Sequence, residues 1–156
     1  MAPKAMNIFT ELNKTLNVKN YIIHAEFKLD ADTFIPIEMN PMRLGGMGLG
    51  NMCFYALGVN PYAYLIKGTA PDWQAIWNKK ENKDVIYNFL IAYNGTKVDL
   101  TKEKPNIDKL KQDLGEVLNE VHFDYQKNLV FGIFTSKETK ESMEKLKSIE
   151  FNDYFA

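Results

Sequence analysis

The chain has 156 residues, of which 46% are hydrophobic and 25% charged, and its formal net charge is −1. A chain of this length can fold as one domain without disulfides or metal ions, and its balanced charge argues against a nucleic-acid or membrane-surface partner. Its single cysteine, Cys53, and its lack of a signal-like or membrane-spanning apolar run predict a cytoplasmic protein with no membrane contact.

The first part of the chain predicts a helix, a hairpin and a glycine-rich loop. Apolar side chains at helical spacing predict the helix over residues 4–17. Two strand-like runs follow at 21–29 and 34–40, and the short polar residues 30–33 between them predict a turn. The glycine-rich stretch 45–50 comes directly after this hairpin.

The rest of the chain predicts further helices mixed with antiparallel strands. The expected elements are a helix at 51–57 ending at Gly58, a helix from Asn60-Pro61 to Gly68, a short helix opened by Pro71, a strand at 84–93 ending in a tight Asn94-Gly95 turn, a helix at 106–114, a hairpin of 117–125 and 128–135, and a last helix capped by Ser136. With no repeat or linker, this pattern predicts one α+β domain over 1–156, an antiparallel sheet flanked by helices.

The first hairpin brings acidic side chains together. If it is centred on Asp32, Glu26 faces Glu38 across the ladder and His24 faces Asn40 one pair away, all on one side. The residues of the second run that the alternation assigns to this side are Phe34, Pro36, Glu38 and Asn40. The sequence therefore predicts two opposed carboxylates with a carboxamide beside them.

Like charges directly opposite each other destabilise a sheet unless something compensates for them. One carboxyl could be protonated, a lysine such as Lys28 could sit between the two, or a divalent cation could bridge them. Glutamate oxygens and an asparagine carbonyl are ligands that Mg²⁺ or Mn²⁺ accepts. A solvated sheet face with Lys28 as partner is the alternative that needs no metal.

The residues after the hairpin suit an anionic ligand. Arg43 is the only arginine among nineteen basic residues, and a guanidinium recognises phosphate or carboxylate in a planar, bidentate way. Chance survival of one arginine is the alternative. The glycines at 45–50 allow close backbone approach to a ligand, or simply a sharp turn. No P-loop is present, and Asn51 and Cys53 stand where a dinucleotide fingerprint needs its third glycine.

Two segments then resemble a known family. They are His24-Ala25-Glu26-Phe27-Lys28 and Pro36-Ile37-Glu38-Met39-Asn40-Pro41-Met42-Arg43-Leu44-Gly45-Gly46. Together they resemble the carboxy-terminal core of the ATP-grasp superfamily, strongly over residues 20–67 and only in general terms beyond. In one respect the chain departs from the family, since Met42 separates Arg43 from the Asn-Pro pair that many members place directly before the arginine.

The resemblance implies a ligand set. The implied ligands of Mg²⁺ or Mn²⁺, and through the metal of ATP, are Glu26, Glu38 and Asn40. The resemblance also implies that Arg43 acts in catalysis by contacting phosphate or an acyl-phosphate. The residues considered for substrate contact are Gly45, Gly46 and His24. An ordinary strand histidine is an equally good account of His24.

The implied activity is that of a carboxylate–amine or carboxylate–thiol ligase, which phosphorylates a carboxylate with ATP and passes the acyl group to the acceptor. Phosphoryl transfer of this kind needs positioning and charge neutralisation rather than a protein nucleophile. Because the other half of the nucleotide clasp lies upstream in this family, we expect the chain to be a fragment that is inactive alone. The alternative is a stand-alone binding or homo-oligomerisation module without catalysis. A third possibility is a metal hydrolase that does not use ATP and acts through the paired carboxylates. It ranks last because the sequence lacks the histidine ligands expected of such an enzyme.

Overall fold

The computed structural model describes residues 2–19, 21–31, 33–41, 44–45, 48–79 and 85–156. The chain packs as two compact units, and each is described below by itself. The first unit spans Met1–Gly46 and Pro61–Pro71, and the second spans Met47–Asn60 and Asp72–Ala156. The single domain over 1–156 expected from the sequence stays a prediction.

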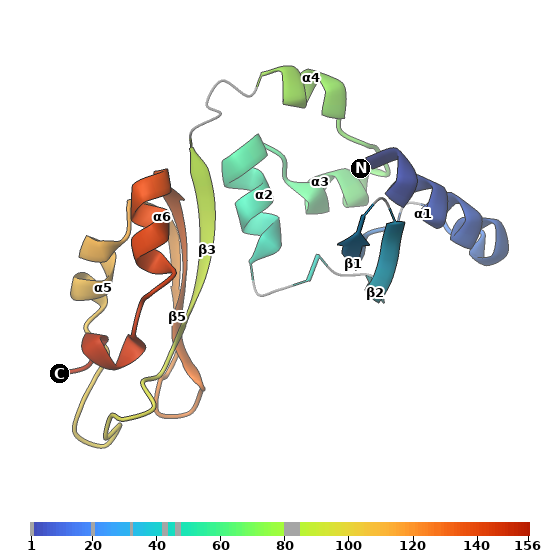
Figure 1. Ribbon diagram of the computed structural model, residues 1–156. Helices are drawn as coiled ribbons and strands as arrows, with labels where there is room; N and C mark the ends of the chain where they lie inside the picture. Colours follow the sequence, from blue (N-terminus) through green and yellow to red (C-terminus); the bar gives the residue numbers. More distant parts are fainter. Residues whose placement is uncertain (1, 20, 32, 42–43, 46–47, 80–84) are drawn as a thin grey trace. The chain divides into compact units, whose positions relative to one another are not determined.

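The first unit is a helix packed on a two-stranded antiparallel sheet, with one further short helix. Its elements are α1 (Ala2–Leu16), β1 (Ile23–Asp30), β2 (Thr33–Pro41) and α3 (Pro61–Lys67) (Figure 1). Ala31, in the turn between the strands, has a φ of 49°, the left-handed conformation that tight hairpin turns require. The helix and both strands therefore form close to where their sequence patterns predicted them.

The ladder of this hairpin contains a β-bulge. On the turn side Phe27 pairs with Pro36, whereas one step further Glu26 pairs with Glu38, so Ile37 is the extra residue. The side chain of Ile37 is 65% exposed. A proline cannot donate to a ladder and is tolerated next to such irregularities, so Pro36 is consistent with a bulge at this point.

The bulge corrects one part of the predicted hairpin. Because an extra residue interrupts the strict alternation, Phe34 and Pro36 lie on the face of Phe27 and not, as predicted, on the face of Glu38. The rings of Phe27 and Phe34 meet at 5.6 Å between centroids, and Phe9 of α1 meets Phe27 at 5.9 Å. One face of the hairpin is therefore aromatic and covered by α1, which leaves the acidic side chains on the other.

The second unit is a three-stranded antiparallel sheet with helices on both faces. Its elements are α2 (Leu49–Leu57), α4 (Trp73–Asn78), β3 (Ile86–Tyr93), α5 (Ile107–Asp113), β4 (Glu116–His122), β5 (Val130–Glu138), α6 (Lys140–Leu146) and a 3-10 helix (Phe151–Tyr154). The strand order is β3-β5-β4, with β5 in the centre. Figure 1 shows α2 on one side of this sheet and α5 and α6 on the other. The predicted α+β class with antiparallel sheets is confirmed.

The main hydrophobic core lies inside this second unit. Its buried members are Ala92, Leu110, Leu114, Phe131, Phe134, Leu146 and Tyr154. They come from β3, β5, α5, α6 and the 3-10 helix, so burial of the apolar faces of these elements holds the unit together. Within the part of the chain that the structure describes, no helix combines the length and apolar content that crossing a bilayer requires.

Two local signals did not act as predicted. Asn94-Gly95 is not a hairpin turn, because β3 pairs with β5 and is followed by the loop that leads to α5. Instead the Asn94 side chain donates to the carbonyls of Tyr125 and Asn128, both at 2.8 Å. Ser136 is not a helix cap, because β5 continues to Glu138 and buries it. The predicted end of α2 at Gly58 is confirmed, with a φ of 67°.

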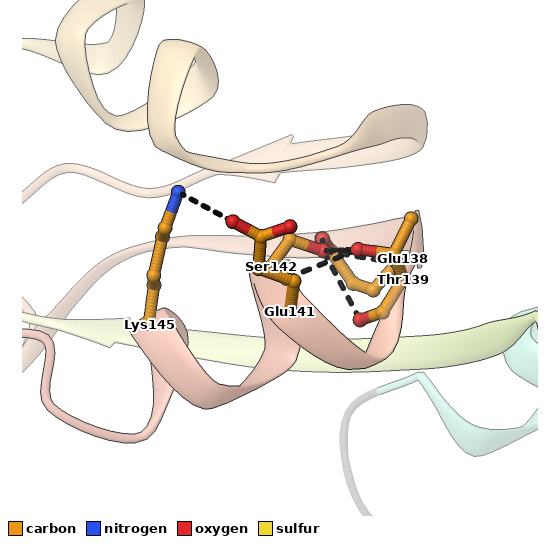
Figure 2. A network of polar contacts seen from close by, with 5 residues as sticks. All are labelled: Glu138, Thr139, Glu141, Ser142 and Lys145. Atoms are coloured by element: carbon orange, nitrogen blue, oxygen red, sulfur yellow. Dashed lines mark hydrogen bonds and ion pairs between the residues drawn. The ribbon is translucent and has the colours of Figure 1, made fainter.

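The junction of β5 and α6 holds a buried carboxylate. Glu138 is 2% exposed and accepts hydrogen bonds from the Gly115 amide and from the hydroxyls of Ser136 and Ser142. Thr139 caps α6, accepting from the Ser142 amide while its own amide donates to the Ser142 hydroxyl. Figure 2 shows Glu138, Thr139 and Ser142 pointing toward one another. This network, which sequence analysis did not anticipate, joins β5 and α6 to the residue that precedes β4.

Candidate metal site on the first hairpin

The face of the hairpin opposite the Phe27 ring carries the candidate metal ligands. In the ladder, Glu26 pairs with Glu38 and His24 pairs with Asn40. This is the register that the sequence predicted. It arises differently, however, because a short turn and a bulge together produce the same pairing that a longer turn would produce. The predicted juxtaposition of two carboxylates with a carboxamide one pair away is confirmed.

The electrostatics of this face rest on like charges held close together. Side chains directly opposite in an antiparallel pair have their Cβ atoms about 5 Å apart. The Glu26 side chain is 50% exposed, and its Oε1 lies 3.9 Å from Nε2 of His24, whose side chain is 22% exposed. Among the described residues, Lys28 forms no ion pair with Glu26, so the structure gives the lysine alternative no support there.

His24 also packs against the backbone that follows the hairpin. Gly45 has a φ of 63°, and a Cβ added to it would lie 1.9 Å from Nδ1 of His24. That Nδ1 is buried and has no hydrogen-bond partner in the described structure. Position 45 therefore requires glycine twice over, because the left-handed conformation disfavours side chains and because the imidazole occupies the space of a Cβ.

The structure describes only some of the remaining predicted site residues. Arg43 and Gly46 lie outside the described residues. Asn40 and Gly45 are partly buried in the first unit. The predicted glycine loop is divided: Gly50 belongs to α2 of the second unit, where it is buried and has a helical role rather than a ligand-facing one.

The donor set fits a hard divalent cation that keeps part of its own hydration. Glu26 and Glu38 offer carboxylate oxygens on one exposed face, and Asn40 offers an amide oxygen next to them. Within the described ranges no group of three or more His, Cys, Asp and Glu residues could hold a metal ion. Mg²⁺ is commonly bound by one or two carboxylates together with waters and substrate phosphates, so a site of this size suits a metal that arrives with phosphate.

Two features of the site escaped sequence analysis. The bulge had one local signal, the proline at position 36 inside a strand-like run. The contact of His24 with Gly45 had none, because the two residues are far apart in sequence and nothing in the local pattern links them.

Comparison with known proteins gives one match. Residues 1–51 match the model of the ATP-grasp domain, which accounts for 51 of the 156 residues. The matched segment contains all of α1, β1 and β2 and ends near the start of α2. This N-terminal segment of the chain is therefore related to the ATP-grasp superfamily, as the resemblance predicted. The match does not identify the segment as the carboxy-terminal core of the family, and it gives residues 52–156 no assignment. No curated protein and no solved structure matches the chain.

Proposed function

We propose that the chain, related through residues 1–51 to the ATP-grasp superfamily, supplies the metal-binding hairpin of an ATP-dependent ligase. The observation that carries the proposal is the pairing of Glu26 with Glu38, with Asn40 one pair away on the same face. Like charges directly opposite each other destabilise a sheet, and a divalent cation held by both carboxyl groups is one arrangement that compensates for them.

The proposed reaction joins a carboxylate substrate to an amine or thiol. A carboxylate oxygen attacks the γ-phosphorus of ATP, the bond to ADP breaks, and the acceptor then attacks the acyl carbon as inorganic phosphate leaves. Bound Mg²⁺ or Mn²⁺ would neutralise charge on the transferring phosphate. Glu26 and Glu38 would hold that ion through carboxylate oxygens and Asn40 through its amide oxygen, and their exposure leaves room for the nucleotide.

The remaining predicted roles belong to the same proposal. Arg43 would contact the transferred phosphate or the acyl-phosphate, and Gly45 and Gly46 would let the backbone approach the substrate. We further propose a cytoplasmic location. We also propose that the 156-residue chain by itself completes no ligation.

The direct test measures Mn²⁺ binding to the 156-residue chain by electron paramagnetic resonance. Glu38→Gln removes one donor charge, and we expect it to weaken Mn²⁺ binding by about 10-fold or more. The matched control is Glu11→Gln on α1, because Glu11 is exposed and paired only with Lys14 among the described residues. Mn²⁺ affinity unchanged by Glu38→Gln, with the circular dichroism spectrum of a folded chain, would refute the metal assignment.

A second candidate function draws on exposed apolar side chains. A groove beside α1 is lined by Met6, Leu12, Leu16, Val18 and Tyr21, all of them exposed. Apolar surface of this kind favours the alternative of a binding or homo-oligomerisation module. Sedimentation velocity at micromolar concentration separates the two, because a monomer that binds Mn²⁺ supports the enzyme and a stable oligomer that does not bind it supports the module.

A further inference from the structure

His24 lies between a candidate metal ligand and the backbone at Gly45. Nε2 of its ring is 3.9 Å from Oε1 of Glu26. The other side of the ring faces position 45, where an added Cβ would lie 1.9 Å from Nδ1, 2.3 Å from Cε1 and 2.4 Å from Cγ. Three ring atoms are thus in contact range of one backbone position. The imidazole fills the gap between β1 and the segment that leaves β2.

This contact is steric rather than a hydrogen bond. Nδ1 of His24 is buried and has no hydrogen-bond partner in the described structure. A buried polar atom without a partner costs free energy, so ordinary stability does not explain why a histidine ring stands here. The ring does, however, prevent the backbone at Gly45 from moving toward β1. It therefore restricts the position of the backbone at Gly45, which follows the last candidate ligand, Asn40, in sequence.

Gly58 provides an internal comparison. It has a φ of 67°, close to the 63° of Gly45, but a Cβ added to Gly58 would meet nothing within 4 Å. The two glycines therefore share the conformational requirement and differ in the contact. The atoms nearest to a Cβ added at Gly45 all belong to His24, so a greater loss of stability in Gly45→Ala than in Gly58→Ala is expected to depend on His24.

We infer that His24 is a positioning residue, whose ring braces the backbone at Gly45 against the face that carries Glu26 and Glu38. The inference rests on the proposed function, since the ligand it serves is a phosphate chain brought to the hairpin by the metal. In this role His24 touches neither the metal nor the phosphate. It sets the distance between the metal ligands and the backbone that follows them.

The first part of the test asks whether the brace exists. We expect Gly45→Ala to lower the thermal midpoint more than Gly58→Ala does, because only the former clashes with the imidazole. Adding His24→Ala should restore most of the loss caused by Gly45→Ala and none of the loss caused by Gly58→Ala. Failure of His24→Ala to suppress the Gly45→Ala defect selectively would overturn the inference.

The second part asks whether the brace serves a ligand. The 156-residue chain is titrated with Mn²⁺ alone and with Mn²⁺ plus inorganic tripolyphosphate. We expect His24→Ala to leave affinity for Mn²⁺ alone within about 2-fold and to weaken tripolyphosphate binding by about 10-fold. A general loss of structure would instead lower both affinities equally, and that result would overturn the positioning role.

The outcomes separate this inference from the proposed function. If the parent chain binds Mn²⁺ but His24→Ala leaves tripolyphosphate binding unchanged, the proposed function stands and the positioning role is wrong. If the parent chain binds no Mn²⁺, the proposed function fails and the ligand role of His24 fails with it. In that case the Gly45 and Gly58 comparison still reports whether the steric brace is real.

Discussion

Glu26 and Glu38 are direct partners in the β1–β2 ladder, so two acidic side chains lie opposite each other on one face of the hairpin. Such a pair is less stable than a neutral one by about 0.2–1 kcal/mol. A cation shared by the two carboxyl groups would replace this repulsion with attraction, as the proposed function requires. This opposite response to metal makes the hairpin testable without an assay of the reaction.

Glu26→Gln should therefore have opposite effects with and without metal. In EDTA we expect the variant to be more stable than the parent by about 0.5 kcal/mol, because the repulsion is removed. In Mn²⁺ the parent should gain stability with metal concentration and the variant should not. Urea unfolding in EDTA and in Mn²⁺ measures both effects. Glu11→Gln is the control, because it should change neither the stability in EDTA nor the stabilisation by Mn²⁺. Equal stabilisation of parent and variant by Mn²⁺ would contradict the site.

The buried carboxylate at the β5–α6 junction predicts a large effect of a small change. The hydroxyl of Ser142 donates to Glu138 at 2.6 Å, so Ser142→Ala leaves a buried charge with one donor fewer and also breaks the cap of α6. We expect a loss of about 1–3 kcal/mol in the free energy of unfolding. Ser148→Ala is the matched control, because that exposed hydroxyl donates only to the Lys145 carbonyl within the described residues. Equal losses in the two variants would show that Glu138 tolerates the missing donor.

Tyr154 predicts a loss of stability in alkali. Burial, together with the hydrogen bond from its hydroxyl to Oδ2 of Asp113, raises the pKa of Tyr154 to about 12. The folded state thus favours the protonated phenol, whose pKa in an unfolded chain is about 10. Its contribution is fully present below pH 10 and is lost as the pH rises toward 12.

Tyr154→Phe removes this titration. The variant should be less stable than the parent at pH 7, by about 1 kcal/mol for the lost hydrogen bond, and its stability should fall less steeply between about pH 10 and 12. Denaturant unfolding across that range measures the slope, and absorbance at alkaline pH follows the phenolate directly. Parallel curves for the two proteins would rule out Tyr154 as the source.

The thiol of Cys53 is expected to react slowly with alkylating reagents. Burial raises the pKa of the Cys53 thiol above its ordinary value, so less thiolate is present at any given pH. Because the thiolate is the reacting form, alkylation at pH 7.5 should be slower than for glutathione and should accelerate over a more alkaline range. Rates of iodoacetamide labelling between pH 7 and 10 check this. A labelling profile whose midpoint falls at the same pH as that of glutathione, or at a lower pH, would contradict the raised pKa of this partly buried thiol.

Local patterns were sufficient where the structure is local. The first helix, the strands of the first hairpin and the end of α2 at Gly58 depend on residues close together in sequence, and they form close to where they were predicted, although the bulge moves Phe34 and Pro36 to the other face. Asn94-Gly95 failed as a hairpin signal because the partner of β3 is the distant β5, and a dipeptide carries no information about that pairing. Ser136 failed as a cap because burial in the central strand outweighed its helix-capping preference.

The candidate site shows the same division. The opposition of Glu26 and Glu38 was predicted from a hairpin centred on Asp32, and it forms because the bulge at Ile37 compensates for a turn that is shorter than this centring assumes. The contact between His24 and Gly45 depends on how the chain returns after β2, which no pattern of residues encodes. Its only trace in the sequence is the glycine itself, and a glycine in a turn has many explanations.

The extra residue at Ile37 has a consequence for how relatives of this hairpin are compared. The two-residue turn by itself would bring Ala25, not Glu26, opposite Glu38, and the bulge shifts the ladder back by one position. A chain with one more residue in its turn and none at position 37 would present the same two carboxylates. In an alignment of such hairpins, an extra residue in the turn can therefore compensate for a missing residue at the bulge. Equivalent positions are better assigned by first aligning the two glutamates and then extending the alignment toward the turn.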